Sequence, residues 1–339
     1  MRRLVGGYAW FFLIVLAICG CNRHTTQTYA FHQEVHGKEN KYEGVVPGEW
    51  GHFRVYENYI AAVFQNTFLT IDIHSGTARV TPVLLEGSKA HLVYALPISD
   101  STILIAAIFE DLRTGVRAAF IGDVDNYGKI RRLVRTDSYL PQQLCAVPGQ
   151  SVIWSIGDRI GSDHIANSYR YFRQWSLFRG LIHAASTDGH ASRVELSGQS
   201  LQCSAAGATE VDLSNRRINM WTLGSRQPIL HENFPSLPFD DGAAVSGNRL
   251  FATVAQNVES VEAGSPSHRL FVLCHNDPTA QWQPVDLSND SDRLVGRVKG
   301  LNLIGSSDRF LVWQTYEPRS EKITIVTEPT PDVRCADGS

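Results

Sequence analysis

The chain has 339 residues, of which 43% are hydrophobic and 19% are charged, with 27 glycines and 14 prolines. This composition is typical of a globular protein and excludes a disordered chain, a collagen-like chain and a membrane protein with many spans. The formal net charge is −3, and a mildly acidic chain does not supply the concentrated basic surface that nucleic acid needs, so we expect no nucleic-acid partner.

Residues 1–20 have the features of an export signal. Arg2 and Arg3 give a positively charged start, and residues 8–18 form an apolar run of the length found in secretory signals. The uncharged stretch 4–21 also approaches the shortest length that spans a bilayer, so a retained membrane anchor is an alternative to cleavage. The residues that end this stretch favour cleavage.

Residues 18–21 read Ile-Cys-Gly-Cys, which resembles the lipoprotein box of bacteria: an aliphatic residue, a tolerant second position, a small residue and the cysteine that is acylated. The resemblance implies that Cys21 becomes the lipid-bearing N-terminus and anchors the protein to a membrane of the bacterial envelope. Asn22 follows the cysteine where some members have Asp. In that family this favours the outer membrane, facing either the periplasm or the surface. Plain secretion is the remaining alternative.

Residues 21–50 are expected to be a lipidated start followed by a polar tether. Residues 22–50 are polar and show no clean hydrophobic period, so we predict a flexible segment of about 25 residues that lifts a folded body off the membrane. His32 and His36 are four residues apart, but no third ligand is near them in the sequence, and we interpret them as solvated side chains.

Residues 51–330 are predicted to be all-β. Short apolar runs with a period of two alternate with turns rich in Gly, Asn, Asp and Ser, as in antiparallel sheets. One phrase recurs six times: a strand end, a short polar turn and a new apolar strand. The copies begin at residues 53, 94, 145, 203, 243 and 302. Strand-turn-strand segments follow at 69–85, 118–134, 181–196 and 270–287, and the first three have glycine-containing turns that suit hairpins.

This long repeat predicts a six-bladed β-propeller, with a C-terminal tail at 331–339. We expect the segment at 51–56 or the segment at 322–327 to close the ring against the other terminus. Two sandwiches or a β-helix fit the repeat less well. The body resembles the broad superfamily of bacterial propellers with WD-repeat-like, quinoprotein-like and sialidase-like members.

One turn resembles the Asp box of sialidase-type propellers, in which an Asp binds turn amides and an aromatic ring packs between sheets. Asp277 and Trp282 stand at the expected separation, while the usual Ser, Gly and Thr are missing. A second fragment, 186–189, is one residue short. Arg54 occupies a place reminiscent of the first arginine of sialidases, but the other catalytic members have no counterpart. The resemblance therefore supports the fold more than it supports catalysis.

Motifs for metals, cofactors and nucleophiles are missing from the sequence. It has no H-E-x-x-H, Walker loop, G-x-S-x-G or paired C-x-x-C motif, and we expect no cofactor and no metal. Residues 123–128 look like a calcium loop, but Val134 stands where a bidentate Glu belongs, so we predict a hairpin turn. His183 and His190 flank one hairpin, and residues 274–275 (Cys-His) end a strand; neither pair requires a metal.

Four cysteines lie in the predicted body and tail of an exported protein, where disulfides form. Cys145, Cys203, Cys274 and Cys335 allow three full pairings. Cys145 and Cys203 hold equivalent places on the inner strands of successive repeats, which makes them a candidate disulfide. Two buried free thiols are the alternative, because inner strands can splay beyond bonding distance.

The segment 168–181 is rich in aromatic residues and arginine, the residue types that are enriched in binding hot spots. Near-helical spacing of three aromatic residues suggests a short helix or an ordered loop. The alternative is that the rings pack on the blade under arginine stems. The candidate partner-binding residues are Tyr169, Arg170, Tyr171, Arg173, Trp175 and Arg179.

The sequence thus favours a lipid-anchored envelope protein that binds a protein or glycan without catalysis. The alternative is a hydrolase or lyase, sialidase-like or otherwise active on carbohydrate, with its site at the central channel. A channel lined by several carboxylates and arginines would favour the enzyme, and an apolar or plugged channel would favour the binding module.

Overall fold

A computed structural model provides the structure of the chain. It describes residues 25–99, 101–136, 139–146, 152–159, 169–178, 181–182, 192–195, 200–204, 207–212, 216–222, 229–231, 239–255, 268–274, 277, 279–285, 298, 300–307 and 309–335. Cys21, Arg179, His183, His190 and His275 lie outside these ranges, as does the predicted turn at 188–189.

The described residues form 27 strands and no helix, so none of their segments is a helix that could span a membrane. The strands make six antiparallel sheets, which we number as blades. Blade 1 has the order β1 (Gln27–Ala30), β7 (Thr77–Pro82), β6 (Thr67–Asp72), β5 (Tyr59–Phe64), β4 (Gly51–Tyr56). Blade 2 has β11 (Ile130–Arg135), β10 (Arg117–Val124), β9 (Thr102–Asp111), β8 (Ser88–Ser99).

The third to fifth blades follow the same plan along the chain. Blade 3 has β12 (Tyr139–Ala146), β13 (Val152–Arg159), β14 (Tyr169–Phe178) and then β15 (Leu181–Ile182), with β16 (Ser192–Glu195) also paired to β14. Blade 4 has β17 (Ser200–Ser204), β18 (Gly207–Asp212), β19 (Arg217–Trp221) and β20 (Ile229–His231). Blade 5 has β21 (Phe239–Ser246), β22 (Arg249–Ala255), β23 (His268–Cys274) and β24 (Gln283–Pro284).

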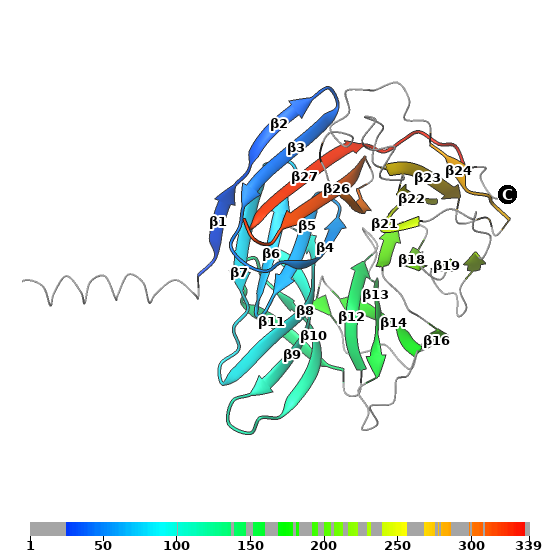
Figure 1. The fold of residues 1–339 in the computed structure, drawn as a ribbon. Helices are drawn as coiled ribbons and strands as arrows, with labels where there is room; N and C mark the ends of the chain where they lie inside the picture. The colour runs from blue at the N-terminus through cyan, green and yellow to red at the C-terminus, as the bar shows by residue number, and fades with distance from the viewer. Residues whose placement is uncertain are drawn as a thin grey trace, which may run out of the picture.

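Blade 6 combines both ends of the described chain. Its order is β2 (His32–His36), β3 (Glu39–Val45), β27 (Lys322–Pro329), β26 (Phe310–Glu317) and β25 (Asn302–Ser306). The innermost strands contact one another in the order β4, β8, β12, β17, β21, β25 and back to β4, which closes the ring (Figure 1). The predicted all-β propeller is confirmed, and each predicted phrase forms the first two strands of one sheet.

Apolar cores between neighbouring sheets hold the ring together. Among the described residues there are six such cores, one at each junction between blades. Because each blade is covered on both faces, its middle strands are buried on both sides: Thr102 to Ala107 of β9 are all buried. This explains why these strands appear in the sequence as continuous apolar runs and not as a strict alternation.

Strands β1 to β3, within residues 27–45, are part of the propeller, which corrects the tether predicted over 21–50. Strand β3 pairs with β27 from Lys322↔Val45 to Thr327↔Asn40, and β2 pairs with β3 at the rim. The segment at 322–327 therefore closes the ring, as expected, but its partner comes from the segment that we predicted to be flexible. Phe31 and Tyr42 are buried in the core between blades 6 and 1, and this apolar burial holds the segment on the ring.

The aromatic- and arginine-rich segment is a strand, which corrects the predicted helix or ordered loop. Residues Tyr169–Phe178 form β14, which pairs with β13 on one side and with β15 and β16 on the other. The near-helical spacing of three aromatic residues did not produce a helix, because the segment pairs with neighbouring strands and such tertiary contacts override local preference.

Candidate functional site

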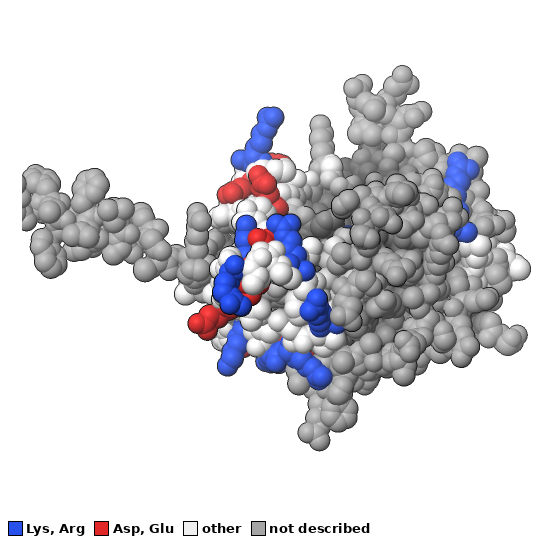
Figure 2. Space-filling model, turned by 90° about the horizontal axis from the view of Figure 1, so that it is seen from below, with Lys and Arg blue, Asp and Glu red and all other residues white. Residues whose placement is uncertain are grey.

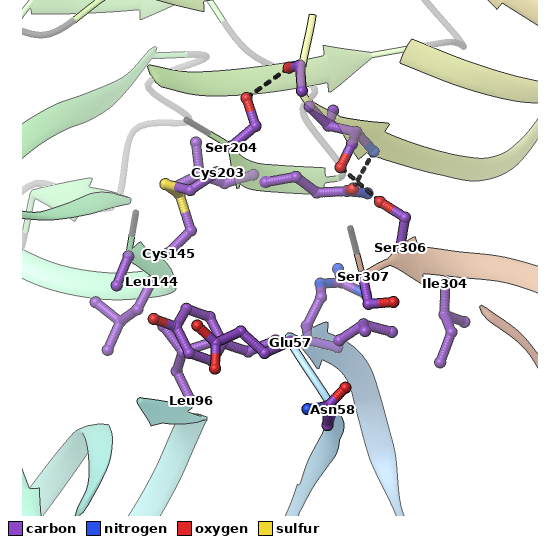
Figure 3. Close-up of a pocket in the computed structure, with 18 of the residues that line it drawn as sticks. Glu57, Asn58, Leu96, Leu144, Cys145, Cys203, Ser204, Ile304, Ser306 and Ser307 are labelled. Atoms are coloured by element: carbon purple, nitrogen blue, oxygen red, sulfur yellow. Dashed lines mark hydrogen bonds between the residues drawn. A yellow bond between two sulfur atoms is a disulfide. The ribbon is translucent and has the colours of Figure 1, made fainter. Parts of the chain in front are cut away.

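The ring encloses a cavity of about 530 Å³ at its centre. The cavity lies at the C-terminal ends of the six inner strands and beside the turns that follow them. Figure 3 shows residues from several blades arranged around this space. The lining is mixed: it includes the apolar side chains Leu96, Leu144 and Ile304, and polar or charged side chains. The polar and charged residues are Arg54, Tyr56, Glu57, Asn58, His74, Tyr94, Gln202, Ser204, Ser306, Ser307 and Arg309.

The tight turn between β4 and β5 places Glu57 at the cavity. Tyr56 pairs with Tyr59, so the turn consists of Glu57 and Asn58 alone. Glu57 has φ +48°, a left-handed conformation that few non-glycine residues adopt. A two-residue hairpin turn favours this conformation, and Gln65, Arg216 and Glu321 also have a positive φ.

Side chains of one inner strand bind the backbone of the next strand. The Gln202 side chain of β17 donates from Nε2 to the Ala243 carbonyl oxygen (2.7 Å) and accepts at Oε1 from the Val245 amide (2.8 Å). The hydroxyl of Ser204 donates to the Gly247 carbonyl oxygen at 2.7 Å, and that of Ser306 to the Val245 carbonyl oxygen at 2.6 Å. These bonds fix the cavity wall on both sides of blade 5, from blade 4 and from blade 6.

The candidate disulfide is part of the same wall. Cys145 of β12 and Cys203 of β17 are joined, with their Cα atoms 5.5 Å apart, and both line the cavity. A second disulfide joins Cys274 at the end of β23 to Cys335, 61 residues later. The segment before Cys335 thus packs on blade 5, where Arg249 Nη1 also donates to the Pro331 carbonyl oxygen at 2.9 Å. The sequence left three pairings open, because nothing local brings the C-terminal segment to blade 5.

Arg54 and Tyr94 connect blade 1 to blade 2 at the cavity. The Arg54 guanidinium hydrogen-bonds the Tyr94 side chain and also donates from Nη1 to the Phe53 carbonyl oxygen at 2.8 Å. Burial raises the pKa of Tyr94 to about 12, and the Arg54 charge and hydrogen bond oppose that rise. Burial, together with the nearby Glu57 charge, also raises the pKa of Tyr56. Both phenols are therefore neutral hydrogen-bonding groups at ordinary pH.

The partner-binding candidates on β14 are not brought to the cavity. Strand β14 is the third strand from the centre of its sheet, after β12 and β13, whereas the cavity lies at the inner strands. One edge of β14 pairs with β13, and on the other edge residues 169–172 pair with β16 and residues 177–178 pair with β15. Sequence reasoning instead missed Glu57, Asn58 and Arg309. Their signal was available, because they stand at or just after the polar turn of the first and last repeats.

The Asp-box-like turn has the structural role that the resemblance implies. Asp277 Oδ1 accepts hydrogen bonds from the Thr279 amide (2.8 Å) and hydroxyl (2.7 Å), and these bonds lower the pKa of the Asp277 carboxyl. Trp282 packs against the core between blades 4 and 5.

The segment at 123–128 is the predicted hairpin turn, where Asp125 Oδ1 accepts from the amides of Tyr127 and Lys129. Within the part of the chain that the structure describes, no three His, Cys, Asp or Glu residues form a group that could hold a metal ion.

No protein-family model matches the sequence, and no curated protein matches it. The solved structures to which the chain is similar are distant. They include YCF48 bound to D1 peptide, with 12% identity over 87% of this chain and 97% of that chain and a TM-score of 0.44. The Cps50 (Swd1) β-propeller domain of Myceliophteria thermophila has 11% identity over 84% and 98%, with a TM-score of 0.41. AztD of Citrobacter koseri has 12% identity over 87% and 79%, with a TM-score of 0.42.

Proposed function

We propose that the protein is a lipid-anchored envelope protein whose propeller binds a protein or glycan partner without catalysis. The observation that carries the binding role is the central cavity, whose wall is fixed by a disulfide and by hydrogen bonds between blades. A rigid, pre-formed concave surface with a mixed polar and apolar lining suits recognition, because little conformational entropy is lost when a partner binds.

Four side chains with nucleophilic atoms at this wall, those of Cys145, Cys203, Ser204 and Ser306, have structural partners. The Cys145 and Cys203 sulfur atoms are bonded to each other, and the hydroxyl protons of Ser204 and Ser306 are directed to backbone carbonyl oxygens. An activated nucleophile instead needs a neighbouring base that takes its proton. The structural role of these four side chains favours the binding role, and Glu57 beside Tyr56 is the pair through which the hydrolase or lyase alternative is tested.

The anchor is supported by the sequence of residues 18–21, and acylation of Cys21 is the first point to test. Mass spectrometry of the N-terminal peptide from membranes should give a diacylated or triacylated Cys21. A Cys21→Ser variant should then leave the membrane fraction. An unmodified N-terminal peptide, or a chain that still carries Arg2 and Arg3, would contradict the anchor.

The binding role is tested by cross-linking in cells followed by capture, and by glycan-array screening of the purified protein. Glu57→Ala with Arg309→Ala should reduce capture of a specific partner at least about tenfold if the cavity mouth is the recognition site. Arg173→Ala with Trp175→Ala should do so instead if β14 is the recognition site. Turnover of a glycan during these assays, abolished by Glu57→Gln, would contradict the non-catalytic role.

A further inference from the structure

The described chain begins beside the junction between blades 1 and 2. Thr81 Oγ1, in the outer part of blade 1, lies 3.4 Å from both Thr26 Oγ1 and the Asn126 carbonyl oxygen. Asn126 belongs to the turn between β10 and β11 in blade 2. A Cβ atom built on Gly128 of the same turn would lie 1.9 Å from the Pro82 carbonyl oxygen, so the turn packs closely on the end of β7. Thr26 is therefore a near neighbour of this turn.

The length of chain before Thr26 limits how far the propeller can stand from an anchor at Cys21. The two positions are five residues apart, and even a fully extended chain spans at most about 18 Å over that number. For comparison, the inner strand β4 lies four strand spacings, or about 19 Å, from the outermost strand β1 of blade 1. The chain between Cys21 and Thr26 is therefore no longer than the width of this blade. A lipid on Cys21 therefore keeps the rim at blades 1 and 2 close to the bilayer, which a tether of about 25 residues would not do.

The same rim has the chemistry of a membrane contact. Residues 129–135 contain four basic residues and no acidic residue: Lys129, Arg131, Arg132 and Arg135. In the adjoining turn, Tyr127 is 74% exposed. Lys and Arg near a surface of anionic lipid are attracted to it, and tyrosine is favoured at the depth of the headgroups. Figure 2, a view from below, shows Lys and Arg side chains on the described surface with Asp and Glu side chains among them.

The protection of a strand edge does not account for all of these features. The Asp125 carboxylate is bound to turn amides, and Glu110 forms its ion pair with Arg117 of β10 at 2.7 Å. Asp123 of β10 lies opposite Arg132 of β11 in the register, and Arg131 Nη1 donates to Thr102 Oγ1 at 3.1 Å. Basic residues also protect an outermost strand from pairing with another chain. That role explains charges along β11, but it does not explain an exposed tyrosine beside the start of the ring at Thr26.

We propose that the rim formed by residues 125–135 rests on anionic phospholipid headgroups, so that the propeller meets the membrane by its edge and leaves the central cavity accessible. The inference rests on acylation of Cys21, which is part of the proposed function. It adds which surface faces the lipid.

The test uses the full, acylated protein in vesicles of phosphatidylcholine and phosphatidylglycerol that carry a nitroxide on the headgroup. A fluorophore is attached at Tyr127→Cys or, as a control, at Leu230→Cys in the outermost strand of blade 4, across the ring. We expect strong quenching at position 127 and weak quenching at position 230. Equal quenching at the two positions in acylated protein would overturn the rim contact and leave the anchor intact. If the N-terminal peptide carries no lipid, the protein has no anchor at Cys21, and the proposed rim contact is wrong as well.

The charges are tested separately on Cys21→Ser protein, whose vesicle binding is reversible and which retains every described residue. Lys129→Glu with Arg131→Glu should weaken binding to vesicles with phosphatidylglycerol at least about tenfold. Arg216→Glu with Arg319→Glu, a matched pair of exposed residues on blades 4 and 6, should have little effect. A similar loss from both pairs would show that net charge alone is responsible and would overturn a specific rim.

Discussion

Gln202 holds Ala243 and Val245 of the neighbouring blade through both ends of one side-chain amide, with distances of 2.7 and 2.8 Å. A single side chain thus replaces the backbone pairing that two inner strands of different blades cannot make. The wall of the cavity depends on such contacts, because inner strands of adjacent blades diverge and belong to separate sheets.

Replacing Gln202 should therefore destabilise the protein. In Gln202→Leu, the Ala243 carbonyl and the Val245 amide lose their partners, which costs about 1–3 kcal/mol of the free energy of unfolding. Urea denaturation followed by tryptophan fluorescence measures the change. Gln281→Leu is the control, because that amide is exposed and its bond to the Thr279 carbonyl oxygen is 3.5 Å long; it should change stability by less than about 0.5 kcal/mol. Equal losses in the free energy of unfolding of the two variants would show that the hydrogen bonds of Gln202 do not hold the neighbouring strand.

The disulfide between Cys145 and Cys203 should contribute more than any one hydrogen bond. It closes a loop of 58 residues, for which the chain-entropy model gives about 4 kcal/mol. The Cys145→Ala and Cys203→Ala double variant should lose up to that amount in urea denaturation. In a reducing buffer, the original protein and the double variant should have similar midpoints. If their difference persists after reduction, the effect comes from packing of the sulfur atoms and not from the cross-link.

Gly128 is expected to resist substitution for two reasons that can be separated. Its φ is +80°, and a Cβ there would lie 1.9 Å from the Pro82 carbonyl oxygen. Gly115 has φ +70° but open space around its Cβ position. Gly115→Ala should therefore cost about 1–2 kcal/mol for the left-handed conformation alone. Gly128→Ala should cost about 1–3 kcal/mol more, because the turn must move away from β7. Thermal or urea denaturation gives both values, and similar costs would contradict the close packing of blades 1 and 2.

Tyr94 makes stability depend on pH in the alkaline range. Its pKa is raised from 10.0 to about 12 by burial, so the unfolded chain releases this proton first. The contribution of Tyr94 is complete below pH 10 and is lost as the pH rises from 10 to about 12, with a limit of about 3 kcal/mol. In Tyr94→Phe, this part of the decline between about pH 9 and pH 12 should disappear. A decline as steep as in the original protein would mean that other groups cause it.

The sequence alone predicted the all-β class and the six-fold repeat. Alternating apolar positions and turn residues are local, and the phrases at 53, 94, 145, 203, 243 and 302 each became a strand pair at the centre of one blade. The equivalence of Cys145 and Cys203 also followed from this repeat, since successive inner strands of a ring are neighbours. The turn at 123–128 was predicted correctly, because Asp and Gly specify hairpin geometry within a few residues.

Contacts between distant segments were decided only by the tertiary structure. Residues 27–45 lack a strong period because their strands lie toward the rim, and the β27–β3 pairing that orders them depends on residues nearly 300 positions later. The path of the C-terminal segment to Cys274, and the gathering of Glu57, Gln202 and Arg309 around one cavity, likewise depend on ring closure. A sequence pattern records which face of a strand is apolar, whereas the assembly of a site depends on which blades close the ring.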